Sequence, residues 1–276
     1  MGSQQPPVAG ARHHLLIAGT GRAGTTFLVE VLTACGLDTE LSRNPHAGYD
    51  RAAQAGLESD PLVPKDHPYV VKSPWAYQFV DQFLADPGLR LDGAILPIRD
   101  LKEAVASRLA LELGHIYGLP GTARLDAPWR EFGTVPGGAA HSLEPLDQAR
   151  ILAHGLHLLL ERLLEHDVPI VMMKFPRFAE DLDYLYAHLR PFLPAGMEAG
   201  DFRAAVAPVV DPARIRVGRE IGRKPADALP TPEEIERIAL KRQVVALQDR
   251  LDRYAWIDRP LKLAERLRRR MRQAIA

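Results

Sequence analysis

The chain is poor in cysteine, with Cys35 as the single one among its 276 residues. An internal disulfide and a cysteine-based zinc cluster are therefore excluded. No apolar run approaches the roughly 20 residues that a membrane span needs, and residues 1–12 lack the apolar core of a signal peptide. Basic and acidic residues number 35 each, so no excess of charge indicates a nucleic-acid partner. We expect a cytoplasmic protein with no membrane span and no nucleic-acid partner.

Two kinds of apolar segment alternate along the chain. Strand-like runs occur at 14–19, 69–72, 93–98 and 169–174, and helical spacing occurs at 24–35, 75–85, 101–113, 146–166 and 179–192. This alternation predicts an α/β fold in which a parallel β-sheet is flanked by helices. The length suits a single domain over 13–276, preceded by a flexible leader at 1–12. From about 231 onward the pattern predicts two further helices, the first capped by Thr231.

The most informative segment is 15–27, which reads LLIAGTGRAGTTF. An apolar run leads into a loop of three glycines, one arginine and two threonines, and helical apolar spacing follows. This order predicts a strand, a turn and a helix N-terminus, where free backbone N–H groups and the helix dipole favour an anion. We expect the loop to bind a phosphorylated small molecule.

The loop departs from two common nucleotide-binding patterns. Gly19 and Gly24 have the spacing of G-x-x-x-x-G-K-[ST], but Thr25 stands at the lysine position, which argues against a kinase or NTPase. With Gly21, the same glycines satisfy the dinucleotide pattern G-x-G-x-x-G. That site needs a second apolar strand ending in an acid about 20 residues later. The segment GLDTEL at 36–41 does not provide that strand, so a Rossmann-like NAD(P)-dependent oxidoreductase is the alternative reading.

GTGRAGTTF resembles the 5′-phosphosulfate-binding loop of the sulfotransferases, in which a basic residue precedes x-Gly-Thr-Thr and an aromatic. Bacterial and Golgi-type members often carry arginine where the cytosolic enzymes have lysine. The cofactor-binding residues that the resemblance implies here are Arg22, Ala23, Gly24, Thr25, Thr26 and Phe27. It also implies a P-loop NTPase-like sulfotransferase fold, with the C-terminal helices as an elaboration.

A second match lies at 93–108, which reads GAILPIRDLKEAVASR. The pattern predicts a short buried strand followed by a helix, with Asp100 as the N-cap. Arg99 and Ser107 are eight residues apart, and sulfotransferases hold the 3′-phosphate of their donor with an arginine and a serine at that spacing. A guanidinium fork suits phosphate oxygens and a hydroxyl adds a neutral donor. The resemblance therefore assigns Arg99 and Ser107 to a second phosphate site.

The catalytic residues are less well defined by the sequence. The run YVVKSP at 69–74 resembles a strand end of bacterial sulfotransferases, and Lys72 would contact the sulfuryl group. Cytosolic members have a histidine base where this chain has Pro74. A general base of histidine or carboxylate type is expected. Glu40 is the first candidate and His46 the second, and the remaining candidates are Asp66, His67 and His115.

The resemblance implies sulfuryl transfer from 3′-phosphoadenosine 5′-phosphosulfate (PAPS) to a hydroxyl, less readily an amine, of a small-molecule or carbohydrate acceptor. The product is 3′-phosphoadenosine 5′-phosphate (PAP), and no metal is required. The irregular stretches 38–68 and 114–145 are interpreted as acceptor-side lids. A non-catalytic nucleotide-binding protein remains a further alternative because the histidine base is replaced. A homo-oligomer is left open.

Basic residues gather late in the chain. Arg214 and the run at 222–224 lie where sulfotransferases often supply a basic loop to the 3′-phosphate, but Pro225 replaces the glycine of that loop and the match is poor. The last helical segment, 261–275, is basic and amphipathic. Its arginines are Arg266, Arg268, Arg269, Arg270 and Arg272. We expect this segment to pack on its parent domain with a solvated basic face.

Overall fold

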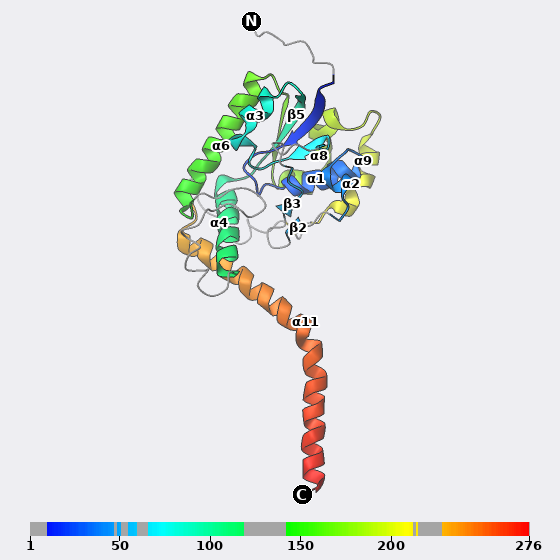
Figure 1. Ribbon diagram of the computed structural model, residues 1–276, viewed down its shortest axis with the longest axis vertical. Coiled ribbons are helices and arrows are strands. Elements are labelled where there is room, and N and C mark those ends of the chain that lie inside the picture. The colour runs from blue at the N-terminus through cyan, green and yellow to red at the C-terminus, as the bar shows by residue number, and fades with distance from the viewer. Residues whose placement is uncertain are drawn as a thin grey trace.

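Four parallel strands form the centre of the fold in the computed structural model (Figure 1). The structure describes residues 10–46, 49–50, 55–59, 66–118, 142–211, 214 and 228–275. The strands are β1 (Arg12–Ile17), β4 (Val70–Lys72), β5 (Leu89–Ile98) and β6 (Ile170–Lys174). They lie in the order β4-β1-β5-β6, which confirms the predicted parallel sheet flanked by helices. A separate antiparallel pair joins β2 (Tyr49–Asp50) to β3 (Ala55–Gly56).

Helices cover both faces of this sheet. The helices of the first half are α1 (Thr25–Ala34), α2 (Glu40–Arg43), the 3₁₀ turn η1 (Ala76–Gln78), α3 (Val80–Ala85) and α4 (Leu101–Gly118). Those of the second half are α6 (Pro145–Glu165), α7 (Arg177–Glu180), α8 (Leu182–Leu189), η3 (Arg190–Phe192), α9 (Ala199–Val206), η4 (Ala207–Val209) and α11 (Pro232–Ile275). Figure 1 shows α3 and α6 on one side of the sheet and α1, α8 and α9 on the other.

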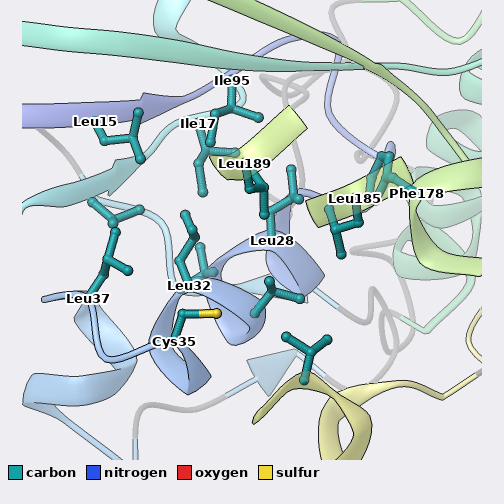
Figure 2. Close-up of a cluster of buried hydrophobic side chains, with 14 of the residues drawn as sticks. Leu15, Ile17, Leu28, Leu32, Cys35, Leu37, Ile95, Phe178, Leu185 and Leu189 are labelled. Atoms are coloured by element: carbon teal, nitrogen blue, oxygen red, sulfur yellow. The ribbon is translucent and has the colours of Figure 1, made fainter. Parts of the chain in front are cut away.

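Alternate residues of the central strands supply the two cores. Leu15 and Ile17 of β1 pack with Leu28 of α1 in the first cluster, which Figure 2 shows, and all three are fully buried. Leu16, which points to the other face, packs with Leu159 of α6. This two-residue alternation is the one that a strand buried on both faces produces. α1 therefore packs against one face of the sheet and α6 against the other.

The strand order reverses between β1 and β5. From β1 the chain crosses to β4 on one side, and it then returns past β1 to β5 on the other. Ligands of open parallel sheets bind where the order reverses in this way. The segment 18–24 follows β1 and Arg99 follows β5, so both predicted phosphate-binding motifs lie at this reversal.

Several predicted helix boundaries need correction. The segment 75–85 is divided between η1 and α3, and 179–192 is divided into α8 and η3, with α7 beginning earlier. Asp181 causes the break before α8, since its side chain accepts a hydrogen bond from the Tyr184 N–H and caps the new helix. In contrast, the predicted N-cap of α4 is confirmed, because Asp100 Oδ1 accepts from the Glu103 N–H at 3.2 Å.

The C-terminal part is one helix rather than the two that the sequence predicts. Thr231 caps it as expected, with its Oγ1 accepting from the Glu234 N–H at 3.3 Å. α11 packs on α4 through Ile235, Ile238 and Ala239. Figure 1 shows it continuing away from the α/β body toward the C-terminus, so the expected packing of its last segment on the parent domain is wrong.

Candidate functional site

The loop between β1 and α1 is built from backbone conformations with positive φ. Gly19, Gly21 and Gly24 have φ values of 122°, 68° and 80°. Arg22 also has a positive φ, 55°, which costs a residue with a side chain about 1–2 kcal/mol. Strain of this kind persists where the surrounding contacts hold it, and it often occurs at ligand sites.

The N-terminus of α1 carries backbone N–H groups that no side chain caps among the described residues. Gly24 is its N-cap and offers no side chain, so no side-chain hydrogen bond caps this helix within the described residues. The first N–H groups of a helix lack intrahelical partners and attract anions. Thr25, which is buried, and Thr26 begin the helix and bring two hydroxyl groups to the same place. The local geometry therefore suits a phosphate or a similar anion.

A Cβ atom has no room at Gly24. It would lie 2.9 Å from ring atoms of both Phe175 and Phe178. Phe178 in turn stacks on Phe27, with ring centroids 6.2 Å apart. Phe27 thus packs at the edge of the apolar core, directly after the loop.

The two predicted phosphate motifs meet directly. The Arg22 Nε donates a hydrogen bond to the Ser107 Oγ at 3.3 Å, across 85 residues of sequence. Arg99 Nη1 donates to the backbone carbonyl of Arg22 at 2.6 Å. The structure therefore brings Arg22, Arg99 and Ser107 together beside the start of α1.

The Arg99 guanidinium is enclosed on several sides. Its side chain is 5% exposed, it pairs with Glu103 Oε2 at 3.3 Å, and its Cζ lies 5.1 Å from the centroid of the Phe175 ring. Burial lowers the pKa of Arg99, although Glu103 opposes that change, and Arg242 of α11 adds a second positive charge nearby. A cation this enclosed is preorganised for an anion that brings compensating negative charge.

A second buried arginine supports the loop from below. Arg108 is 2% exposed, and its Nη2 donates to the carbonyl of Thr20. Burial lowers the pKa of Arg108 to about 10 and raises that of the nearby Glu112 carboxyl to about 7. The carbonyls of Thr20 and Arg22 are thus each held by an arginine of the strand-to-helix segment that follows β5.

Lys72 lies at the end of β4, next to the start of α1. Its Nζ donates to Thr26 Oγ1 at 3.0 Å, to the Gly56 carbonyl at 2.6 Å and to Glu58 Oε1 at 3.0 Å. The side chain is 1% exposed, and burial lowers the pKa of the ammonium even though Glu58 opposes the change. These bonds join the segment 55–59 to the loop, and they bring a carboxylate that the sequence analysis did not single out.

Two further groups complete the surroundings. Ser73 is 1% exposed and its Oγ has no hydrogen-bond partner among the described residues. Its N–H donates to the Ile17 carbonyl, which fixes it at the carboxyl edge of the sheet. On α1, Glu30 is buried and accepts from Arg214 Nη1 at 2.8 and 3.0 Å. Arg214 therefore neutralises a buried carboxylate, whereas Arg216 and 222–224 lie outside the described residues.

The two favoured candidates for the general base lie elsewhere. Glu40 begins α2, and its N-cap Thr39 bonds Thr33 at 2.6 Å in the last turn of α1, at the opposite end from the loop. His46 is exposed in the turn after α2, where its N–H bonds Asn44. The structure does not group either residue with Arg22 and Lys72. Of the two expected acceptor lids, the second lies mostly at 119–141, outside the described residues.

Sequence reasoning missed Glu58, Glu112 and the support role of Arg108. Glu58 falls in a polar irregular stretch with no periodicity, so no local signal separates it from a surface acid. Arg108 directly follows the predicted Ser107 within α4. Its burial depends on packing against the loop, and a sequence pattern does not indicate such tertiary packing. Lys72 was found only through the resemblance of its strand end.

In the part of the chain that the structure describes, no group of three His, Cys, Asp or Glu side chains is placed to hold a metal ion. The same residues include no helix that is both long and apolar enough to cross a membrane.

A comparison with models of known protein families gave no match, and neither did a comparison with curated protein sequences.

Proposed function

We propose that this chain is a sulfotransferase that binds PAPS at the carboxyl ends of β1 and β5 and transfers its sulfuryl group to an acceptor hydroxyl. The observation that carries the proposal is the meeting of Arg22, Arg99 and Ser107 at the uncapped start of α1. Arg22 belongs to one motif, and it contacts Arg99 and Ser107 of the other, which follow it by 77 and 85 residues. On this proposal the fold is of the P-loop NTPase-like sulfotransferase type.

The donor set suits a ligand with two separate phosphates. On this proposal the N–H groups of α1, with Thr25 and Thr26, bind one phosphate, and Arg99 and Ser107, which both contact Arg22, bind the second. PAPS carries anionic groups on both its 5′ and 3′ sides, whereas ATP and NAD have no 3′-phosphate. The loop also lacks the lysine that reaches the outer phosphates of ATP. A 3′-phosphorylated adenosine donor therefore fits this site better than either alternative.

The chemistry follows from the positions of Arg22 and α1. The acceptor oxygen attacks sulfur, a new O–S bond forms, and the bond between sulfur and the 5′-phosphate oxygen breaks in line with it. The electron pair passes to that phosphate oxygen, so PAP leaves with an added negative charge. Arg22, Thr26 and the N-terminus of α1 stabilise this charge, as preorganised donors do in other group transfers.

Glu58 is the proton acceptor that the geometry favours. It and Thr26 each lie 3.0 Å from the same ammonium, that of Lys72, so this carboxylate is close to the start of α1. Its side chain is 14% exposed, which leaves it accessible to an acceptor. Glu58 takes the proton of the attacking hydroxyl, while Lys72 holds Glu58 and Thr26 in place. Glu40 and His46 remain predictions with no described contact that supports this role.

Product formation tests the proposal. The purified chain is incubated with radiolabelled PAPS and 4-nitrophenol as the probe acceptor, a phenol whose low pKa reduces the demand on the base. We expect labelled aryl sulfate and PAP in equal amounts. Arg22→Ala should lower kcat by on the order of 10²-fold. Arg90→Ala, which changes an exposed arginine on the other end of β5, is the matched control and should leave kcat unchanged.

Two results would count against this mechanism. An unchanged kcat in Arg22→Ala would remove the loop from the chemistry. Absence of any sulfated product with phenol, simple sugars and amines alike, in a protein that still binds PAP, would indicate the non-catalytic nucleotide-binding alternative.

A further inference from the structure

The outer part of α11 has no packing partner in the described structure. The helix packs on α4 through Ile235, Ile238 and Ala239, and further along it Gln243 Nε2 donates to the Gly114 carbonyl at 3.2 Å. From 244 to 253 every side chain is exposed. The helix continues to Ile275, and Figure 1 shows it leaving the body. An isolated helix is only marginally stable in water, so a partner that covers it is expected.

An apolar stripe runs along this unpartnered part. Leu240, Val244, Leu247 and Leu251 recur at intervals of four, three and four residues, the spacing of one helix face. Their exposed fractions are 46%, 52%, 55% and 68%. Such a row of large exposed apolar side chains marks an interaction surface rather than an ordinary solvated face.

The sequence continues to place apolar residues at helical steps up to the end of the helix, and because the steps average about 3.5 residues the row moves gradually around the helix. After Leu251, apolar residues recur at steps of three or four through Tyr254, Ile257, Leu261, Ala264, Leu267, Met271 and Ile275. From Leu240 to Ile275 this pattern extends over about 50 Å of helix. The helix has too many charged residues to cross a bilayer, so this pattern suits a helix that lies on a surface.

Charge identifies the kind of surface. Residues 259–276 contain seven basic side chains and one acid, a net charge of +6. Because the whole chain is neutral, the remainder carries −6. A segment that combines apolar residues at helical spacing with concentrated arginine, next to Trp256, is the composition of helices that bind anionic lipid headgroups.

We propose that α11, from about Leu240 to its end, binds the surface of an anionic lipid bilayer and holds the α/β body against it. A second copy of the chain fits less well, because parallel pairing of two such helices would place their arginine clusters side by side. Nucleic acid would satisfy the arginines but would leave the apolar stripe uncovered. The proposal does not depend on the activity proposed above.

Vesicle sedimentation of the purified full chain tests the proposal. We expect binding to phosphatidylcholine vesicles that contain phosphatidylglycerol, little binding to phosphatidylcholine alone, and release as NaCl approaches about 1 M, where the screening length is ~3 Å. The triple variant R268Q/R269Q/R270Q should bind on the order of 10²-fold more weakly. The double variant L247Q/L251Q should also weaken binding, since it interrupts the apolar stripe.

The matched control removes three exposed arginines from the body, in R12Q/R90Q/R150Q, and should bind the anionic vesicles as the unchanged chain does. Helix content by circular dichroism confirms that each variant is folded. Equal binding to neutral vesicles, or undiminished binding in R268Q/R269Q/R270Q, would overturn the proposal. So would failure to bind the anionic vesicles. A dimer in light scattering that L247Q/L251Q converts to monomer would then indicate a second copy of the chain as the partner, and tight binding of duplex DNA would indicate nucleic acid.

Discussion

Glu112 gives the most quantitative prediction, because its environment links a buried carboxyl to the stability of the fold. The residue is 3% exposed on α4, one turn after Arg108, whose guanidinium holds the Thr20 carbonyl. Burial raises the pKa of Glu112 from 4.5 to about 7 and outweighs the opposing attraction of Arg108. The neutral carboxyl is thus favoured in the folded protein relative to the unfolded chain.

The sign of the pH effect follows from proton binding. Between pH 4.5 and 7 the folded state holds more protons at Glu112 than the unfolded state, so stability falls as pH rises through this window. The loss of stability that comes from ionising Glu112 in the folded protein is small below pH 4.5 and complete above pH 7. From pH 5 to pH 8 the shift removes about 2.5 kcal/mol of unfolding free energy.

Glu112→Gln removes this titration while keeping the size and hydrogen-bonding capacity of the side chain. Urea unfolding of the variant and the unchanged chain at pH 5 and pH 8 measures the effect. We expect their difference in unfolding free energy to move by about 2.5 kcal/mol in favour of the variant between the two pH values. Glu161→Gln, the same change at an exposed site on α6, is the control. A constant difference for Glu112→Gln, or an equal shift in the control, would refute the reasoning.

Two other predictions concern the loop and its support. Glu58→Ala should lower the unfolding free energy by about 3 kcal/mol, because it leaves the buried Lys72 ammonium without its carboxylate. Adding Lys72→Met should recover part of this loss. If the effects of the two substitutions in urea unfolding are additive instead, the two residues are not paired. Gly24→Ala should destabilise the fold by more than Gly36→Ala. Both glycines have positive φ, but only at Gly24 would the added Cβ lie 2.9 Å from ring atoms. Equal losses of thermal stability in the two variants would show that this contact is unimportant.

The parallel sheet could be predicted because its strands are buried on both faces and read as continuous apolar runs between helical segments. Leu15 to Ile17 and Ala94 to Leu96 are clear examples. The break at Asp181 was missed because a side-chain cap interrupts an otherwise regular helical pattern. α11 was divided in two because Pro260 disrupts the helical spacing, yet the helix continues through it.

The proposed donor site could be predicted where its residues lie close together in the sequence. Arg22 and Thr26 belong to one loop, and Arg99 and Ser107 belong to one strand-to-helix segment, so each pair has a recognisable spacing. Glu58 has no such spacing relative to the loop. It reaches Lys72 through a segment whose position depends on tertiary packing.

Calorimetric titration with PAP tests the central claim most directly, with ATP and NADPH plus magnesium as competitors in parallel cells. The account predicts that PAP binds more tightly than ATP or NADPH. It also predicts that Arg99→Ala and Ser107→Ala both weaken PAP binding, by roughly 10-fold or more for the arginine. Clear binding of NADPH or ATP with no binding of PAP would contradict the account. It would indicate that the glycine loop binds a dinucleotide or a nucleoside triphosphate instead.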